Sequence, residues 1–186
     1  MPNIAETKVL IIVTHGFEQS ELEFPRDQLR AKGAEVHVAT LDGKAIKGWE
    51  GSDWGREAEA DLKIEDANPH DYDALVIPGG QINPDLLRVE ESVLALVRTF
   101  HDQGKVVAAV CHAPWVLIEA GIVAGRRMTC YTSIRTDLEN AGAKVMDTSV
   151  VADNGIVTSR KPDDLKDFVA KIVEEIEEGT HGRKAA

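Results

Sequence analysis

The chain has 186 residues, of which 43% are hydrophobic and 28% charged, as expected for one compact globular domain. Its formal net charge of −11 gives an acidic surface that repels phosphate backbones, which argues against nucleic acid as a direct partner. The apolar run at 9–13 is too short to span a membrane or to form the core of a secretion signal. We therefore expect a cytoplasmic single domain over 1–186, without membrane contact and with loose ends at 1–7 and 179–186.

Short apolar runs alternate with amphipathic segments along the chain. We predict strands at 8–13, 36–41, 74–77, 106–110 and 128–131, and helices at 20–32, 90–102, 113–120, 134–140 and from 162 onward. The polar stretch 43–61 predicts a small hairpin or edge element, and Asp153-Asn154-Gly155 predicts a hairpin turn within 150–158. This alternation predicts an α/β fold in which helices cover both faces of a mostly parallel sheet.

Ligands of such sheets bind beyond the carboxyl ends of the strands, which directs attention to the loops after Val13, Ile77 and Val110. Cys111 follows the most apolar strand and precedes a helix, with small residues two places away on either side. This pattern is typical of a nucleophile elbow, and a helix N-terminus lowers a thiol pKa. A buried structural cysteine is the alternative interpretation, since free cysteines are often buried.

His112 is a candidate base for Cys111. Neighbouring helical residues point about 100° apart, so adjacency alone does not establish a contact between the two side chains. His112 could instead cap the helix or face another subunit.

Two loops near the same edge contain further candidates. Glu18, in the loop after the first strand, could be a partly buried carboxyl group with a raised pKa that donates a hydrogen bond to the sulfur, or an ordinary exposed carboxylate. Gly79 and Gly80 could present backbone N–H groups as an oxyanion hole, or form a plain turn. Cys130 lacks such a context and is interpreted as a packing residue.

No metal site and no cofactor motif are predicted. Two cysteines cannot form a disulfide framework or a four-ligand zinc site, and the histidines lack metal-ligand spacing. A reducing compartment, in which a free thiol persists, fits this composition.

These motifs resemble the PfpI-type branch of the PfpI/ThiJ superfamily of stress proteins and intracellular cysteine peptidases. The matching segments span nearly the whole chain and occur in the family's order: 17–29, 71–80, 104–121, 125–129 and 157–165. The resemblance implies a flavodoxin-like three-layer sandwich with Cys111 as the nucleophile, Glu18 as its protonated carboxyl partner and His112 as the base. It also implies oxyanion donors at Gly80 and at the amide of His112.

The sequence departs from the family pattern at two positions. Ala113 stands where the family usually has glycine after Cys-His. Asp85 follows Pro84 where family peptidases often have a glutamate directed at the histidine of an adjacent subunit. By this resemblance we expect a homodimer or larger homo-oligomer in which Asp85 approaches the partner's active-site histidine through a weak contact.

The resemblance also implies a stress-protective cysteine enzyme that acts through Cys111 on small carbonyl compounds or their protein adducts, as a glyoxalase or deglycase does. The alternatives are an intracellular cysteine peptidase that acts on peptides, and a non-enzymatic redox sensor or chaperone that signals by oxidation of Cys111.

Overall fold

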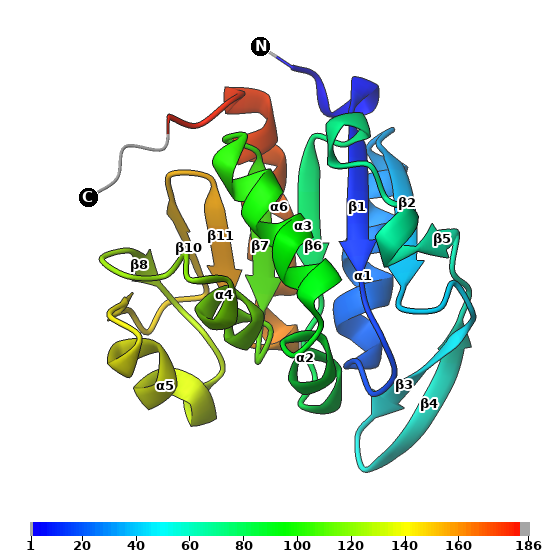
Figure 1. The fold of residues 1–186 in the computed structure, drawn as a ribbon, viewed down its shortest axis with the longest axis horizontal. Helices are drawn as coiled ribbons and strands as arrows, with labels where there is room; N and C mark the ends of the chain where they lie inside the picture. Colours follow the sequence, from blue (N-terminus) through cyan, green and yellow to red (C-terminus); the bar gives the residue numbers. More distant parts are fainter. Residues whose placement is uncertain (1, 183–186) are drawn as a thin grey trace.

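A seven-stranded sheet forms the middle layer of the molecule (Figure 1). The computed structural model describes residues 2–182. In spatial order the strands are β10 (Val150–Asp153), β11 (Ile156–Ser159), β7 (Val106–Val110), β6 (Ala74–Ile77), β1 (Lys8–Ile12), β2 (Glu35–Thr40) and β5 (Leu62–Lys63). Neighbouring strands are parallel except for the antiparallel pair of β10 and β11. The carboxyl ends of β1, β6 and β7 therefore lie side by side.

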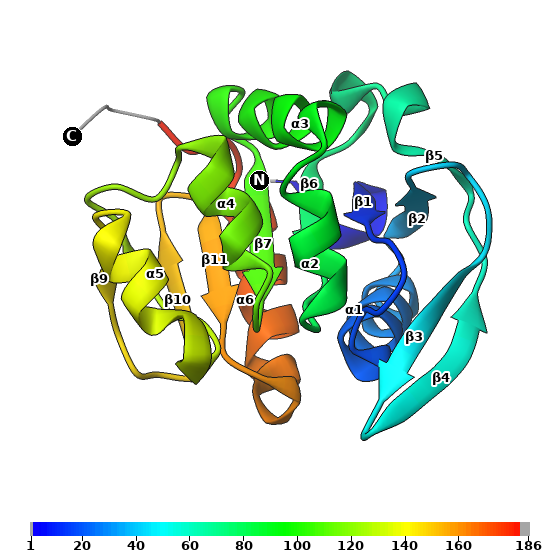
Figure 2. The same ribbon diagram turned by 60° about the horizontal axis from the view of Figure 1, so that its bottom comes forward.

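Helices cover both faces of the sheet (Figure 2). One layer contains α1 (Gln19–Ala31) and α6 (Leu165–Glu178), and the other contains α3 (Glu91–Asp102), α4 (Pro114–Ala120) and α5 (Arg135–Asn140). Alternate strand residues enter two separate cores: Val9 and Ile11 pack in the layer of α1 and α6, whereas Leu10 and Ile12 pack in the opposite layer. Burial on both faces explains why these strands are continuous apolar runs. The predicted three-layer α/β fold is confirmed.

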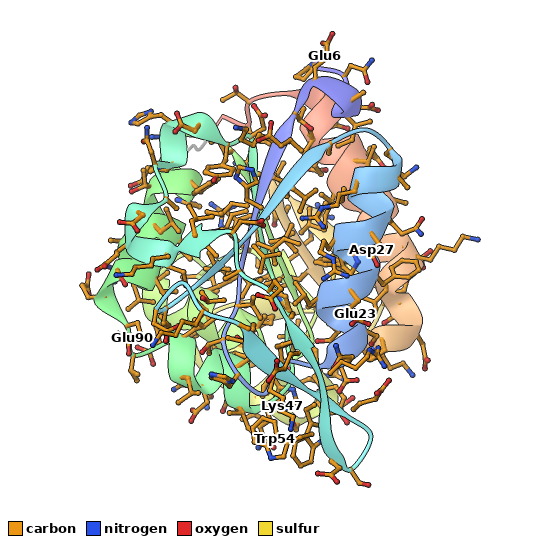
Figure 3. The ribbon with its side chains drawn as sticks, turned by 90° about the vertical axis from the view of Figure 1, so that its right-hand side faces the viewer. Glu6, Glu23, Asp27, Lys47, Trp54 and Glu90 are labelled. Carbon is orange, nitrogen blue, oxygen red and sulfur yellow. The ribbon has the colours of Figure 1, made fainter. Side chains whose placement is uncertain are left out.

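Two small strand pairs and several short 3₁₀ turns lie outside the main sheet. The hairpin of β3 (Ile46–Glu50) and β4 (Asp53–Ala58) projects beside the carboxyl end of the sheet, with Lys47 and Trp54 on it (Figure 3). A separate two-stranded sheet pairs β8 (Arg127–Met128) with β9 (Lys144–Val145). Short 3₁₀ turns are η1 (Ile4–Glu6), η2 (Ile64–Asp66), η3 (Pro69–Asp71), η4 (Thr132–Ile134) and η5 (Pro162–Asp164).

Two local predictions need correction. The segment at 128–131 is a strand only at its start, because the chain turns away after Met128 and the Tyr131 N–H donates to the Cys111 carbonyl. Sequence patterns also missed α2 (Ile82–Leu87), a short helix that contains Pro84 near its start. Proline is tolerated there because the first N–H groups of a helix have no intrahelical partner.

The ends are more ordered than predicted. Ile4 and Thr7 are buried, and the Thr7 hydroxyl donates to the Ile4 carbonyl. The His181 N–H donates to the Gly104 carbonyl at 2.9 Å, which fixes the segment after α6. Residues 4–7 and 179–182 therefore make defined contacts with the rest of the fold, whereas 1 and 183–186 lie outside the described residues. Within 2–182, no helix combines the length and apolar character that crossing a bilayer requires.

Candidate active site

Cys111 occupies a tight turn between β7 and α4. Its φ of 63° lies in the left-handed region, which residues other than glycine rarely adopt. Its N–H donates to the Ser159 carbonyl at 3.0 Å, and its own carbonyl accepts the Tyr131 N–H at 2.9 Å. Both backbone groups are thus held by neighbouring segments, which keeps the strained conformation in place. The structure therefore contains the predicted elbow, with Cys111 at its apex.

The loop after β6 packs against this elbow. A Cβ atom at Gly79 would lie 2.6 Å from Cys111 Cβ, so the close approach of the two loops requires glycine there. The Gly79 N–H donates to Glu21 Oε2 at 2.8 Å and is therefore not free to hold a substrate oxyanion, which corrects the prediction for Gly79. The N–H groups of Gly80 and His112 instead point to the Cys111 sulfur, and both lower the pKa of its thiol.

Glu21, not Glu18, is the buried carboxyl partner of Cys111. Glu21 is fully buried in the first turn of α1 and interacts with the Cys111 side chain. Helical Cα–Cβ bonds tilt toward the helix N-terminus, so a side chain in the first turn reaches back to the sheet edge. Glu18 precedes the helix as its N-cap residue, is only half-buried, and pairs through its backbone with Trp49. The prediction for Glu18 as the partner of the thiol is thus wrong.

Burial controls the protonation of this pair. Burial raises the pKa of Glu21 to about 8, and the charge of Glu18 adds to the shift. Glu21 is therefore mainly protonated at neutral pH. Burial, followed by the charge that Glu21 carries when ionised, also raises the pKa of the Cys111 thiol. This direction is opposite to the one predicted from the helix N-terminus, because the side chain is only 5% exposed and desolvation outweighs the N–H donors.

The His112 ring lies between the sulfur and the surface. Its Nδ1 is 3.1 Å from Cys111 Sγ, and its Nε2 is 3.0 Å from the Ser133 hydroxyl oxygen. The ring stacks on Tyr131, with centroids 4.6 Å apart, and meets the Trp115 ring edge-on at 5.2 Å. Burial lowers the pKa of His112, so the ring is neutral near neutral pH. The thiol–imidazole contact that adjacency alone did not establish is present.

These groups open into a cleft of about 280 Å³ at the carboxyl end of the sheet. It is lined by Glu18, Glu21, Trp49, Gly51, Gly80, Gln81, Cys111, His112, Tyr131 and Pro162. Glu18 is therefore retained as a rim residue, and burial raises the pKa of its carboxyl group. Asp85 is exposed on α2 and does not line the cleft within its own chain.

Sequence reasoning missed Glu21, Tyr131 and Ser133. A signal for Glu21 exists, because it shares the 21, 25, 29 stripe of α1 with buried Pro25 and Leu29. A carboxylate on a buried stripe is unusual enough to be singled out. Tyr131 and Ser133 have no comparable signal, since their place depends on how the segment after β8 turns back to the elbow.

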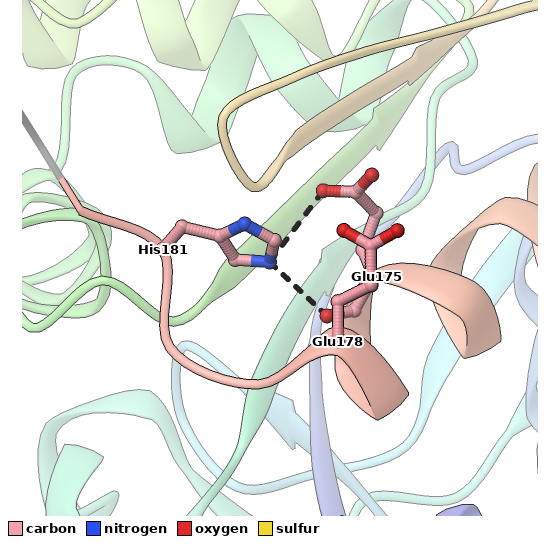
Figure 4. A group of neighbouring side chains, drawn as sticks. All are labelled: Glu175, Glu178 and His181. Atoms are coloured by element: carbon pink, nitrogen blue, oxygen red, sulfur yellow. Dashed lines mark hydrogen bonds and ion pairs between the residues drawn. The ribbon is translucent and has the colours of Figure 1, made fainter. Parts of the chain in front are cut away.

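One group of potential metal ligands lies elsewhere among residues 2–182. Ligand atoms of Glu175, Glu178 and His181 lie within 4.8 Å of one another (Figure 4). However, His181 Nε2 is 3.1 Å from the Glu175 carbonyl oxygen, and Glu175 Oε2 accepts the Gly155 N–H at 3.2 Å. These contacts hold His181 against the last turns of α6 and occupy one oxygen of Glu175, so a cation would have to displace them.

The two thiols differ in their surroundings. Cys130 is also buried, and burial raises its pKa to about 12. Cys111 has in addition an open cleft, a base at 3.1 Å and two N–H donors for its thiolate. We therefore expect graded mild peroxide, followed by peptide mass spectrometry, to modify Cys111 before Cys130. Equal or reversed modification would show that these groups do not activate Cys111.

The fold is thus a mostly parallel α/β sandwich whose cleft contains a cysteine at a strand-to-helix turn, a buried carboxyl group and an adjacent histidine. The DJ-1/PfpI family model matches residues 7–175, and the chain belongs to this family. The predicted family is thus confirmed.

Named relatives agree with this assignment. Deglycase TK1284 of Thermococcus kodakarensis is 39% identical over 166 residues, which cover 89% of this chain and 97% of that protein. General stress protein 18 of Bacillus subtilis is 42% identical over 163 residues, covering 87% of this chain and 92% of the relative. The crystal structure of Drosophila melanogaster DJ-1beta superposes with a TM-score of 0.83 at 30% identity, over 92% of this chain and 94% of that one.

Proposed function

We propose that the protein is a stress-protective cysteine enzyme that acts on reactive carbonyl compounds or their protein adducts, as a glyoxalase or deglycase. The observation that carries the proposal is the position of Cys111 Sγ, which contacts the His112 base and the buried Glu21 carboxyl group at the end of a small cleft. The names of the Thermococcus and Bacillus relatives support the activity and the stress role respectively.

The first chemical step follows from these contacts. The Cys111 thiol gives its proton to His112 Nδ1 as its sulfur attacks the carbonyl carbon, so that the S–H bond breaks, a C–S bond forms, and the carbonyl π pair moves to the oxygen. An oxygen two bonds from the sulfur is within reach of the Gly80 and His112 N–H groups, which stabilise its charge. Protonated Glu21 can deliver its proton to that oxygen, so that a neutral hemithioacetal forms.

A 2-oxoaldehyde substrate allows turnover without an outside oxidant. A proton leaves the sulfur-bearing carbon and another is added to the neighbouring carbonyl carbon through an enediol, which leaves a thioester beside a new hydroxyl group. Water then hydrolyses the thioester to a 2-hydroxy acid and returns the thiol. The net reaction adds one water molecule, because the aldehyde carbon is oxidised while the adjacent ketone carbon is reduced.

The dimensions of the cleft favour a small substrate over a peptide. A volume of about 280 Å³ lies just below the roughly 300 Å³ at which the usual range for small-molecule sites begins. Trp49, Tyr131 and Glu18 border the space above the sulfur. The assay below therefore also distinguishes the two alternatives, a peptidase and a redox sensor.

The assay compares methylglyoxal and its adduct on N-acetylarginine with a panel of fluorogenic peptides under reducing conditions. We expect consumption of the dicarbonyl or of its adduct and no peptide hydrolysis. Peptide hydrolysis alone would support the peptidase. If neither activity were found while Cys111 was oxidised stoichiometrically, the redox sensor would replace the enzyme.

We also propose that the protein is a homodimer with α2 in its interface. Asp85 is exposed on α2 together with the apolar side chains of Ile82, Leu86 and the following Val89. We expect light scattering at micromolar concentration to give twice the mass of one chain, and Leu86→Glu to give monomers. In a monomeric wild-type protein, Asp85 could not approach a second subunit's histidine, and the dimer proposal would be discarded.

A further inference from the structure

The thiol proton of Cys111 needs a route to solvent. The Cys111 and Glu21 side chains are 5% and 0% exposed, and His112 is 8% exposed. Ser133, in contrast, is an exposed residue of η4, and its hydroxyl oxygen lies 3.0 Å from His112 Nε2. The contacts Cys111 Sγ–His112 Nδ1 and His112 Nε2–Ser133 Oγ therefore form a chain from the buried sulfur to the surface.

A hydroxyl group suits this position because it can either accept or donate a hydrogen bond. When the thiol donates to Nδ1, the ring is protonated at Nε2, and Nε2–H donates to Ser133. When the thiolate accepts from Nδ1–H, Nε2 is unprotonated and accepts the Ser133 O–H. The ring can thus change tautomer and stay neutral, which burial favours.

Among groups of the same chain, the surroundings of the ring leave this role to Ser133. The titratable side chains that contact His112 or share its cleft are Cys111, Tyr131, Glu18 and Glu21. No described carboxylate forms an ion pair with the ring, and the nearby Trp115 donates its indole N–H to Asp137 at 2.8 Å. The segment that carries Ser133 is held to the elbow by the hydrogen bond from Tyr131 N–H to the Cys111 carbonyl.

We propose that Ser133 is a positioning residue that orients His112 and passes the thiol proton of Cys111 to solvent. The sulfur keeps its electron pair while its proton moves to His112 Nδ1. The proton on Nε2 moves to Ser133 Oγ, and the hydroxyl proton of Ser133 moves to water. This inference shares with the proposed function only the assignment of Cys111 as nucleophile, and it names an intrachain partner for His112 that does not depend on a dimer.

The test measures the pH profile of Cys111 alkylation by iodoacetamide, read on the Cys111 peptide by mass spectrometry, and needs no carbonyl substrate. We expect Ser133→Ala to slow alkylation near neutral pH about three- to tenfold, the effect of one hydrogen bond. Ser133→Thr, which keeps the hydroxyl, should restore most of the rate. Thr132→Ala, at the neighbouring exposed position, is the matched control and should leave the profile unchanged.

A second readout follows the imidazole itself. Nitrogen NMR of His112 should show a changed tautomer balance in Ser133→Ala. It should show a raised His112 pKa in Ser133→Asp, because an ionised carboxylate only accepts and so stabilises the imidazolium. If both the alkylation profile and the His112 signals of Ser133→Ala matched the wild type, the inference would be overturned even if the enzyme consumed methylglyoxal. If Ser133→Ala showed the expected changes in alkylation and in the His112 signals, but the wild type did not turn over methylglyoxal, only the proposed function would be overturned.

Discussion

We expect replacement of Cys111 by serine to lower the proposed activity on dicarbonyl compounds about a thousandfold or more, as the loss of a nucleophile commonly does. A serine hydroxyl is a far weaker nucleophile than a thiolate and would need a stronger base than the neutral, buried His112. Initial rates with methylglyoxal, measured on the wild type and on Cys111→Ser at equal concentration, check this expectation.

Cys130→Ser is the matched control for that experiment. Cys130 is buried and does not line the cleft, so its replacement removes a thiol that lies outside the candidate site. It should retain most of the activity. Comparable losses in the two variants would point to a general effect of thiol removal on folding, and an active Cys111→Ser would refute the assignment of the nucleophile.

We expect replacement of Glu21 by alanine to slow alkylation of Cys111 near neutral pH by about tenfold or more. Glu21 raises the pKa of the thiol only when it is ionised; near neutral pH it is mainly protonated, and its O–H can donate to the thiolate. Glu21→Gln keeps an N–H donor and should do less harm. Glu18→Gln, three residues earlier, serves as the matched control. It should change the alkylation rate less than about twofold, which is the size of effect usual for a substitution outside a buried contact. Rates of iodoacetamide alkylation against pH distinguish these variants, and a larger effect at Glu18 would reverse the assignment.

The same carboxyl group makes stability depend on pH. Its pKa is about 8 in the folded chain against an ordinary value of 4.5, so the folded state binds the Glu21 proton more tightly than the unfolded state. The associated stability is present below pH 4.5 and is lost as the pH rises toward 8, by on the order of a few kcal/mol. Urea unfolding at several pH values should show this decline in the wild type and a flatter profile in Glu21→Gln.

The sequence predicted the sheet well because its information is local. The buried strands at 74–77 and 106–110 are continuous apolar runs with clear ends, and they coincide with β6 and β7. The helix α2 was missed because six residues with a proline give no hydrophobic period to recognise. The segment after Met128 was predicted as a strand because its composition is β-like, whereas its path is set by contacts with the distant elbow.

The candidate site was predicted only in part, because some of its residues are indicated by local sequence and others depend on contacts between distant segments. Cys111 can be identified from local sequence because an apolar strand precedes it and a helix follows it. The choice between Glu18 and Glu21 depends instead on the exact start of α1, which sequence patterns place poorly. The Ser133 contact with His112 joins residues 21 positions apart through a loop, and no local pattern encodes such a contact.

The role of Cys111 as the nucleophile is tested most directly by the amount of 2-hydroxy acid formed from methylglyoxal per protein molecule, measured under reducing conditions for the wild type and for Cys111→Ser. We expect lactate in many-fold excess over the wild-type protein and essentially none with the variant. Lactate limited to one equivalent, or formed equally by the variant, would contradict the claim that Cys111 is the nucleophile of a carbonyl-processing enzyme.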